Sequence, residues 1–175
     1  GWDKQHLGLA YSYGKNRKHG GILAKDAVSK LLSDVPLVNY TAFDLNSLQE
    51  LQDIIGDMPM VLDDDYIDIN PLWKKGKKIV INRDNVEEFV RSRNTSKDYS
   101  NKTRMQRQKL YIQTYINQLK TQLTNDYSTT LQKMYDFYSK LTTNITLKEI
   151  DSYAEMILNY SIDNNEYYTL PGEDQ

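Results

Sequence analysis

The chain contains no cysteine and only two histidines, so few of its side chains can act as nucleophiles or bind a transition metal. Without cysteine there are no disulfide bonds, thiolate nucleophiles or cysteine metal sites, although the cellular compartment stays open. His6 and His19 lie outside any metal-ligand spacing, and the acidic run 63–65 lacks the calcium-loop pattern. We interpret His19 as a loop residue and the acidic run as a solvated turn, although such a run could bind a cation.

Several sequence motifs are also missing. No Gly-x-Ser-x-Gly motif, Walker loop or dinucleotide fingerprint occurs, which removes support for hydrolase and nucleotide-binding classes. No apolar run approaches the roughly 18 residues of a membrane-spanning helix, and the N-terminus lacks a signal-peptide pattern. The formal net charge is -2, so bulk attraction to nucleic acid or to an anionic membrane is not expected. As written, we expect the chain to be soluble.

The 175 residues suffice for one domain, which we place at residues 1–175. Apolar spacing and breaker residues predict helices at 21–34, 46–56, 84–91, 103–123, 127–141 and 147–160. Runs of β-branched and aromatic residues predict strands at 37–45, 58–63, 77–82 and 166–171. Capping boxes are predicted for the pairs Asp84–Glu87 and Thr146–Glu149. This alternation favours an α/β domain with a mixed β-sheet that is covered by helices on both faces.

Positive charge is concentrated in residues 89–110, "FVRSRNTSKDYSNKTRMQRQKL". Arg91 and Arg93 are two residues apart, so in an extended conformation both side chains would point to one side. The planar fork of arginine suits phosphate oxygens better than lysine does, and two forks on one face can grip a diphosphate. The next helix places Arg104, Arg107 and Gln108 in its first turns, where free amides and the helix dipole favour an anion.

The same helix continues as an aliphatic stripe with Ile112, Ile116, Leu119 and Leu123. A cationic head that leads into such a stripe suits an amphiphile with phosphate at one end. The alternative is that the stripe packs on the sheet and that the arginines are simply solvated. The lysine-rich turn at 74–78 is a weaker candidate, because lysine matches a diphosphate less well.

The order of several segments resembles the LytR-CpsA-Psr family of cell-envelope proteins. "FVRSR", a polar loop and "RMQRQ" at a helix start resemble the family signature. "LGLAYSYG" is similar to its alanine-tyrosine-rich segment, "VPLVNYTAFDLNSLQELQDIIG" to its strand and following helix, and "LWKKGKKIVINRDNVEEFVRSR" to its approach to the paired arginines. The resemblance covers most of the chain through about residue 123 and is looser beyond.

The resemblance implies a membrane-anchored, extracytoplasmic α/β domain on the wall side of the cell membrane of bacteria, mainly Gram-positive ones. It implies a transferase that moves a glycan, such as teichoic acid or capsule, from a polyprenyl pyrophosphate carrier to peptidoglycan. The motif residues that would contact the pyrophosphate and act in catalysis are Arg91, Arg93, Arg104 and Gln108. The residues that would bind the rest of the substrate, including the polyprenyl tail, are Arg107, Ile112, Ile116 and Leu119.

The reaction that the resemblance implies is a phosphoryl transfer to a sugar hydroxyl of peptidoglycan, governed by positioning and electrostatics. Fixed guanidinium groups would stabilise the charge that develops on the leaving phosphate. Magnesium (Mg2+) would share that role. Its ligands have no counterpart in this chain, so no metal-binding residue is assigned here.

The chain departs from the family pattern in two ways. "SNKTR" stands where members often have an acidic residue and a glycine before the helix-start arginine, and Asp98 is only a loose substitute. The family's early strands, magnesium-binding aspartates and Ser-x-Pro-Arg-Asp-like motif have no counterpart and should precede Gly1. We therefore expect an excerpt that lacks its membrane anchor and part of its active site, and that is inactive alone.

Two rival functions follow from the same residues. One is a polyprenyl-phosphate binding module of the cell envelope without catalytic activity, which the preceding sequence would distinguish by its acids. The other is a transcriptional regulator, as older names for the family suggest. The negative net charge, the lack of a helix-turn-helix pattern and the lack of aromatic residues interleaved in the basic cluster argue against a nucleic-acid partner.

Overall fold

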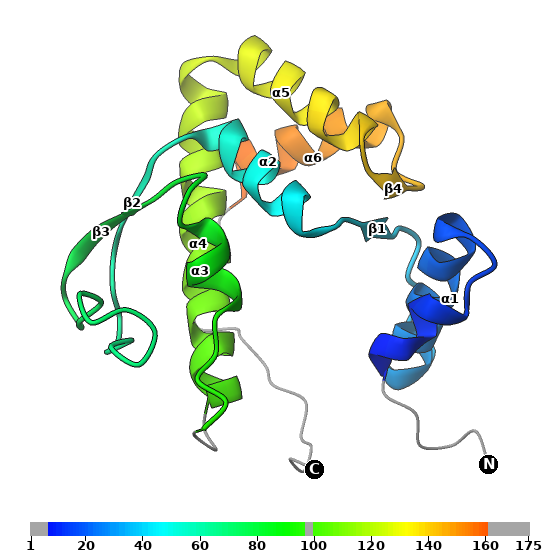
Figure 1. Ribbon diagram of the computed structural model, residues 1–175. Coiled ribbons are helices and arrows are strands. Elements are labelled where there is room, and N and C mark those ends of the chain that lie inside the picture. Colours follow the sequence, from blue (N-terminus) through cyan, green and yellow to red (C-terminus); the bar gives the residue numbers. More distant parts are fainter. Residues whose placement is uncertain (1–6, 97–99, 161–175) are drawn as a thin grey trace.

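The computed structural model describes residues 7–96 and 100–160, so the predicted strand at 166–171 and Asp98 lie outside the described residues. The elements follow in the order η1 (Leu7–Tyr13), α1 (Arg17–Leu31), β1 (Thr41–Ala42), α2 (Leu45–Ile55), β2 (Met58–Val61), β3 (Lys78–Ile81), α3 (Val86–Arg91), α4 (Ser100–Asn125), α5 (Tyr127–Ser139), β4 (Thr142–Thr143) and α6 (Leu147–Asn159). A body built around α4 is joined through β1 to an N-terminal unit, residues 7–43 (Figure 1).

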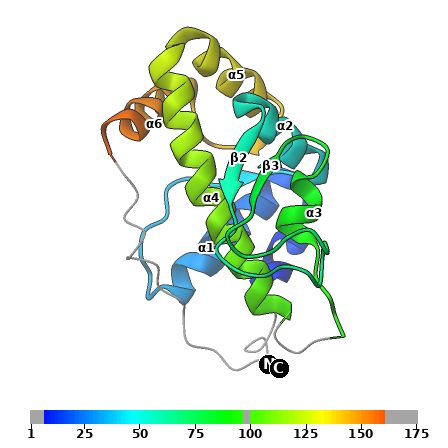
Figure 2. The same ribbon diagram turned by 90° about the vertical axis from the view of Figure 1, so that its left-hand side faces the viewer.

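Helix α4 is the central element of the body. It spans 26 residues, and α2, α3, α5, α6 and β2 all contact it, as Figures 1 and 2 show from two sides. The hydrophobic core draws on every one of these elements, and none of its described members precedes Leu48. Among its most completely buried side chains are Met58, Ile81, Phe89, Leu123 and Ile150. The body therefore carries the core, and the N-terminal unit lies outside it.

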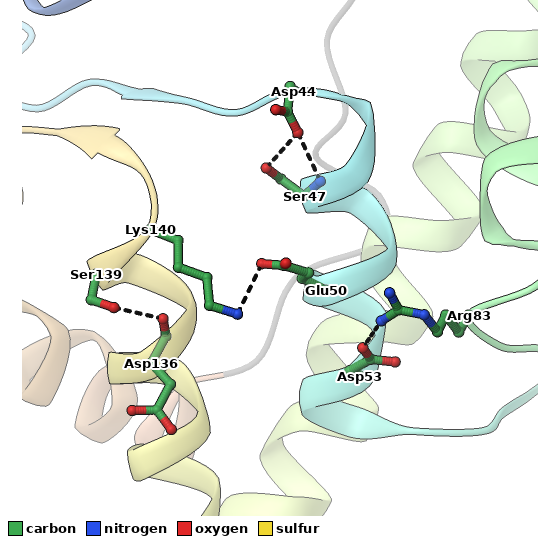
Figure 3. A network of polar contacts seen from close by, with 8 residues as sticks. All are labelled: Asp44, Ser47, Glu50, Asp53, Arg83, Asp136, Ser139 and Lys140. Carbon is green, nitrogen blue, oxygen red and sulfur yellow. Dashed lines mark hydrogen bonds and ion pairs between the residues drawn. The ribbon is translucent and has the colours of Figure 1, made fainter.

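Helix α2 is tied to its neighbours on both sides by ion pairs. Glu50 Oε2 forms an ion pair at 3.3 Å with the Nζ of Lys140 at the end of α5. Asp53 forms an ion pair with Arg83 just after β3 (Figure 3). These pairs are partly solvated, so each contributes at most about 1 kcal/mol. Their main effect is to fix the orientation of α2 between α5 and the β2–β3 hairpin.

The protein belongs to the α/β class, as predicted, but its sheets are smaller than expected. In the described residues the strands form two separate antiparallel pairs, β1 with β4 and β2 with β3, rather than one mixed sheet. The β2–β3 hairpin buries Met58, Met60 and Ile81 and exposes Val61 and Val80 on its other face. Helices therefore cover one face of this pair, not both, in the part that the structure describes.

The predicted strand at 37–45 shrinks to the two residues of β1 for an identifiable reason. Backbone groups need partners, and only Thr41 and Ala42 find them in β4. On the N-terminal side, the Asn144 side chain replaces a strand: its Oδ1 accepts the Tyr40 amide at 2.8 Å and its Nδ2 donates to the Val38 carbonyl at 3.0 Å. A single amide side chain thus satisfies the extended segment without a ladder.

The helix starts separate a correct capping prediction from a wrong one. Thr146 and Glu149 form the predicted reciprocal capping box at the start of α6. The box predicted for Asp84 and Glu87 is wrong, because the residue before α3 is Asn85 and it makes no side-chain cap. Glu87 turns toward Arg91 instead, and that contact competes with capping.

The N-terminal unit is held by close glycine contacts rather than by an apolar core. Helix α1 begins at Arg17, four residues earlier than predicted, and includes the adjacent glycines 20 and 21. A Cβ atom at Gly21 would lie 2.3 Å from the Tyr40 ring, so only glycine lets this ring lie on the helix. This contact connects α1 to the segment that leads into β1.

Candidate active site

The two parts of the basic motif meet where α3 ends beside the first turns of α4. Arg91 is the last residue of α3, and Arg93 follows it by two positions in extended chain. Helix α4 begins at Ser100, three residues earlier than predicted, and packs along α3. This packing brings Arg104, Arg107 and Gln108 close to the segment that carries the paired arginines.

Two α4 side chains grip the backbone at the end of α3. Arg107 Nε donates to the Phe89 carbonyl at 2.8 Å and its Nη2 donates to the Ser92 carbonyl, while Gln108 Nε2 donates to the Val90 carbonyl at 3.2 Å. The last carbonyls of a helix have no partner within the helix, so outside donors satisfy them. We call this set of three hydrogen bonds the carbonyl clamp. It fixes the backbone from which Arg91 and Arg93 project.

Arg107 is buried inside this junction, with 1% of its surface exposed. Its guanidinium lies 5.5 Å from the centre of the Tyr66 ring, a cation–π contact, and Tyr66 in turn donates to Asp63 at 2.6 Å. Burial lowers the pKa of Arg107, the interaction with Tyr66 opposes that decrease, and Arg104 adds to it. Because Arg104 affects the pKa of Arg107, its positive charge lies near the clamp.

The loop between β2 and β3 supports the clamp from outside. Tyr66 and Trp73 from this loop both pack edge-on against Phe89, with ring centroids 6.3 and 5.2 Å away. The loop therefore presses on the residue whose carbonyl Arg107 binds. No local pattern indicates a role for Tyr66, which directly follows the acidic run at 63–65.

The remaining arginines of the motif are more accessible. Arg93 is exposed and makes no hydrogen bond or ion pair within the described residues. Arg104 donates from Nη2 to Asn101 at 2.6 Å, while its buried Nε has no partner in that part of the chain. Arg91 forms an ion pair with Glu87 one turn earlier in α3. Arg93 and Arg104 thus have donors available for an anion, and Arg91 would have to leave Glu87.

The surface next to Arg91 along α3 is acidic. A polar cleft of about 460 Å³ is lined by Asp84, Glu87, Glu88, Arg91 and Ser92. Three carboxylates there outnumber the single arginine, so this cleft does not favour a diphosphate. An anion bound by Arg91 would therefore have to approach from outside this cleft and displace Glu87.

The aliphatic stripe does not run along one open surface. Ile112 is 47% exposed, Ile116 is half-buried against the core, and Leu119 is buried within it. The stripe therefore rotates from solvent into the core along α4, and Leu123 lies in the core as well. Only Ile112 and part of Ile116 have surface that could contact a lipid tail.

The described residues do not fit the magnesium ion that the resemblance implies. No group of three or more histidine or acidic side chains in 7–96 and 100–160 is arranged to hold a metal. The carboxylates of the acidic run accept hydrogen bonds from within the loop between β2 and β3. Asp63 accepts one from the Tyr66 hydroxyl, Asp64 one from the Asp65 amide, and Asp65 one from the Lys75 amide.

The comparisons with known proteins agree with the resemblance in the sequence. A family model described as the LytR_cpsA_psr family matches residues 1–175. A comparison with curated proteins finds no match. No helix in the described ranges combines the length and apolar composition needed to cross a membrane.

Three solved structures share the fold at low sequence identity. Lin1025 from Listeria innocua has a TM-score of 0.64 at 23% identity, over 86% of this chain and 60% of its own. TagV from B. subtilis has a TM-score of 0.68 at 16% identity, over 90% of this chain and 58% of its own. EF0465 from Enterococcus faecalis, described as a transcriptional regulator, has a TM-score of 0.66 at 18% identity, over 88% of this chain and 53% of its own. The chain thus spans little more than half the length of these proteins.

Proposed function

The chain belongs to the LytR-CpsA-Psr family, and we propose that it forms part of a phosphotransferase that attaches a cell-wall glycopolymer to peptidoglycan. The donor would be a teichoic acid or capsule-type glycan on a polyprenyl pyrophosphate carrier. The proposal places the protein on the extracytoplasmic side of the bacterial membrane, held by an anchor outside this chain. It also treats residues 1–175 as one domain whose further catalytic acids lie upstream.

One observation carries the proposal: the clamped junction between α3 and α4 presents arginine donors that the described protein leaves unused. Among the residues in 7–96 and 100–160, the exposed Arg93 has no hydrogen-bond or ion-pair partner, and the buried Nε of Arg104 has none either. A buried donor without a partner costs free energy, so a phosphate oxygen at this position would relieve that cost. Arginine forks match phosphate oxygens, and the charge-assisted bonds are among the stronger ones in proteins.

The chemistry requires stabilisation of negative charge. The acceptor hydroxyl would attack the phosphorus that carries the glycan, forming a new P–O bond while the pyrophosphate bridge breaks. The leaving polyprenyl phosphate then takes the electron pair and the charge, and the proton of the acceptor hydroxyl passes to water. Arg91, Arg93 and Arg104 would stabilise it, because donors fixed in advance need no reorganisation during the reaction.

The clamp residues act differently from the way the motif suggests. Arg107 and Gln108 direct their donors at three backbone carbonyls and hold the segment that carries Arg91 and Arg93. Their contribution to the reaction would be indirect, through the position of those arginines. The polyprenyl tail would lie along Ile112 and the exposed part of Ile116, with Leu119 supporting that surface from the core.

Binding of a soluble lipid pyrophosphate tests the location of the site. Geranylgeranyl pyrophosphate, titrated into the 175-residue chain, should shift backbone NMR signals of residues 91–96 and 100–108. Geranylgeranyl monophosphate should bind more weakly, because it offers fewer oxygens to the same forks. Signals of the lysine turn at 74–78 serve as the internal control. Shifts confined to that turn would show that the assigned site is wrong.

A lipid-phosphate binding module without catalytic activity is the second candidate. It needs only the arginine donors at the α3–α4 junction, where the Nε of Arg104 is buried without a partner among the described residues. Transfer of a glycan from a polyprenyl pyrophosphate donor, measured with the longest form of the protein, separates the two. A protein that binds the donor tightly and yields no glycan–peptidoglycan product supports the binding module.

A further inference from the structure

A second cleft lies between the N-terminal unit and the body. It measures about 360 Å³ and is lined by three segments that are far apart in sequence: Tyr11 and Arg17, then residues 42–44 with Ser47, then residues 140–142. Its volume lies in the range of sites that bind small molecules, and such sites often form where two structural units meet. The arginine motif at residues 89–110 contributes no residue to it, whereas Tyr11 and Phe43 lie in other segments that resemble the family.

Two aromatic side chains in this cleft are open to solvent. Tyr11 is 36% exposed and Phe43, which directly follows β1, is 56% exposed. Solvent-exposed aromatic surface beside polar groups is a frequent mark of a binding site. The face of an aromatic ring is electronegative, so it attracts the weakly positive C–H groups of a flat ligand. The C–H face of a pyranose ring has this character.

The polar side chains of the cleft have unused hydrogen-bonding capacity. Asp44 accepts both bonds from Ser47, at 3.1 and 3.0 Å, through Oδ1, which leaves Oδ2 with capacity to accept a further hydrogen bond (Figure 3). The bonds from Ser47 hold the pKa of Asp44 below its usual value, so the group accepts and does not donate. The Arg17 guanidinium and the Thr142 hydroxyl make no hydrogen bond to the described residues.

The signs of these charges exclude a simple anion as the best ligand. Arg17 and Asp44 carry opposite charges and line the same cleft, and Arg17 itself contributes to the low pKa of Asp44. The third charged residue, Lys140, is paired with Glu50. A phosphate attracted by Arg17 would be repelled by Asp44. A hydroxyl group both donates and accepts, so neighbouring hydroxyls can satisfy both side chains.

We propose that this cleft is a saccharide subsite that takes a hexose or N-acetylhexosamine ring of an oligosaccharide. Phe43 and Tyr11 would lie against the C–H face of the ring, while Asp44 and Arg17 would hydrogen-bond its hydroxyls. The bound sugar would belong to the acceptor glycan only if the proposed transfer function is right. Saccharide binding itself does not depend on that function.

The test uses the 175-residue chain and a neutral probe, the β-1,4-linked tetrasaccharide of N-acetylglucosamine. Calorimetric titration should detect binding to the wild-type chain. Phe43→Ala should weaken it roughly two- to tenfold, because stacking on the ring is lost, whereas Phe43→Tyr should retain it. Arg17→Gln should weaken binding about tenfold, since a charged donor is lost. Leu72→Ala, at a residue 65% exposed in the β2–β3 loop, is the control and should have no effect.

Three results would overturn the subsite: no binding to the folded wild-type chain, unchanged affinity in both Phe43→Ala and Arg17→Gln, or displacement of the tetrasaccharide by inorganic phosphate. Melting temperatures confirm that the variants fold, which is expected because Phe43 is outside the core. Geranylgeranyl pyrophosphate binding, measured on the same variants, should be unchanged. If pyrophosphate fails to bind while the sugar results hold, the proposed function is wrong and the subsite stands.

Discussion

The inner and outer parts of the basic segment contain the same residue type in opposite environments. Arg107, on the inner side, is buried and donates hydrogen bonds to the carbonyls of Phe89 and Ser92. Arg93, on the outer side, is exposed and makes no hydrogen bond or ion pair with the described residues. One arginine holds the backbone, and the other keeps its donors toward solvent, where we propose that a ligand binds. The difference teaches that burial, more than motif membership, separates an arginine that supports the fold from one whose donors stay available.

The helical period explains how α4 produces this division. Arg104 and Arg107 are three residues apart, yet only Arg107 and Gln108 turn inward onto α3, and Tyr111 and Tyr115 continue that face into the core. Met105 and Ile112 lie on the exposed face. Arg104 lies between the two faces, which leaves its head partly exposed and its Nε buried.

The largest expected effect comes from breaking the inner side. Arg107→Ala leaves two buried carbonyls without donors and removes the contact with the Tyr66 ring, so we expect the free energy of unfolding to fall by roughly 3 to 5 kcal/mol. Urea unfolding followed by circular dichroism measures this. Arg107→Lys should recover only part of the loss, because an ammonium cannot reach both carbonyls with a planar fork.

Met105→Ala, on the exposed face of the same helix, is the matched control and should change stability by less than about 0.5 kcal/mol. If Arg107→Ala is as stable as this control, the clamp does not support the junction. The comparison between inner and outer arginines would then lose its basis.

The next effect comes from the outer side and should leave the fold intact. The double variant Arg91→Ala, Arg93→Ala removes two exposed forks, so affinity for geranylgeranyl pyrophosphate should fall about a hundredfold, while the urea midpoint should move little. Calorimetry and urea unfolding of the same samples give both values. Replacing Lys74 and Lys77 together by alanine removes equal charge elsewhere and should change affinity only slightly. Unaltered pyrophosphate affinity in the arginine double variant would reject the site.

The sequence was informative where local patterns decide structure. Apolar spacing predicted the main helices, and the Thr146–Glu149 pair predicted the start of α6, because both features depend on residues within one or two turns. The strand at 37–45 was overestimated, because the Asn144 side chain, about a hundred residues away, takes the place of a partner strand. A contact at that separation leaves no local pattern.

The packing of the segment with the paired arginines on the next helix agrees with the motif, since α3 and α4 are in contact. The role of these arginines in binding a pyrophosphate stays a prediction. The motif could not show that Arg107 points inward, because that depends on how α4 is rotated against α3. Tyr66 was missed for a similar reason: its contact with Arg107 arises from tertiary packing of the β2–β3 loop.

A smaller effect should come from the outer support of the clamp. Tyr66→Phe keeps the ring under Arg107 and removes only the hydrogen bond to Asp63, so stability at pH 7 should fall by about 1 kcal/mol. Burial, with a further contribution from Asp63, raises the pKa of Tyr66 above that of an unfolded tyrosine. The stability that depends on the neutral phenol is therefore present below about pH 10 and is lost as pH rises further.

The phenylalanine variant cannot ionise at this position, so the gap between wild type and variant should shrink above about pH 10 and then change sign. Urea unfolding of both proteins between pH 7 and 10.5 measures the gap. Other tyrosines and lysines titrate in both proteins and cancel in the difference. A gap that stays constant across this range would show that Tyr66 is not buried against Arg107 as described.

The smallest expected effect tests whether the ion pair between Arg91 and Glu87 competes with ligand binding. An exposed ion pair four residues apart on a helix contributes about 0.3 to 0.5 kcal/mol, so Glu87→Gln should lower stability by only that amount. In this variant Arg91 binds a diphosphate without first losing the free energy of its ion pair with Glu87. Affinity for geranylgeranyl pyrophosphate should therefore rise about twofold. Glu88→Gln is the control, because Glu88 is also in the first turn of α3 but forms no ion pair with Arg91. Calorimetry at low salt measures both variants, and the gain should vanish near 1 M salt, where exposed charges are screened. An equal gain in both variants would attribute the effect to net charge near the site, and no gain in Glu87→Gln would show that the ion pair does not compete with the ligand.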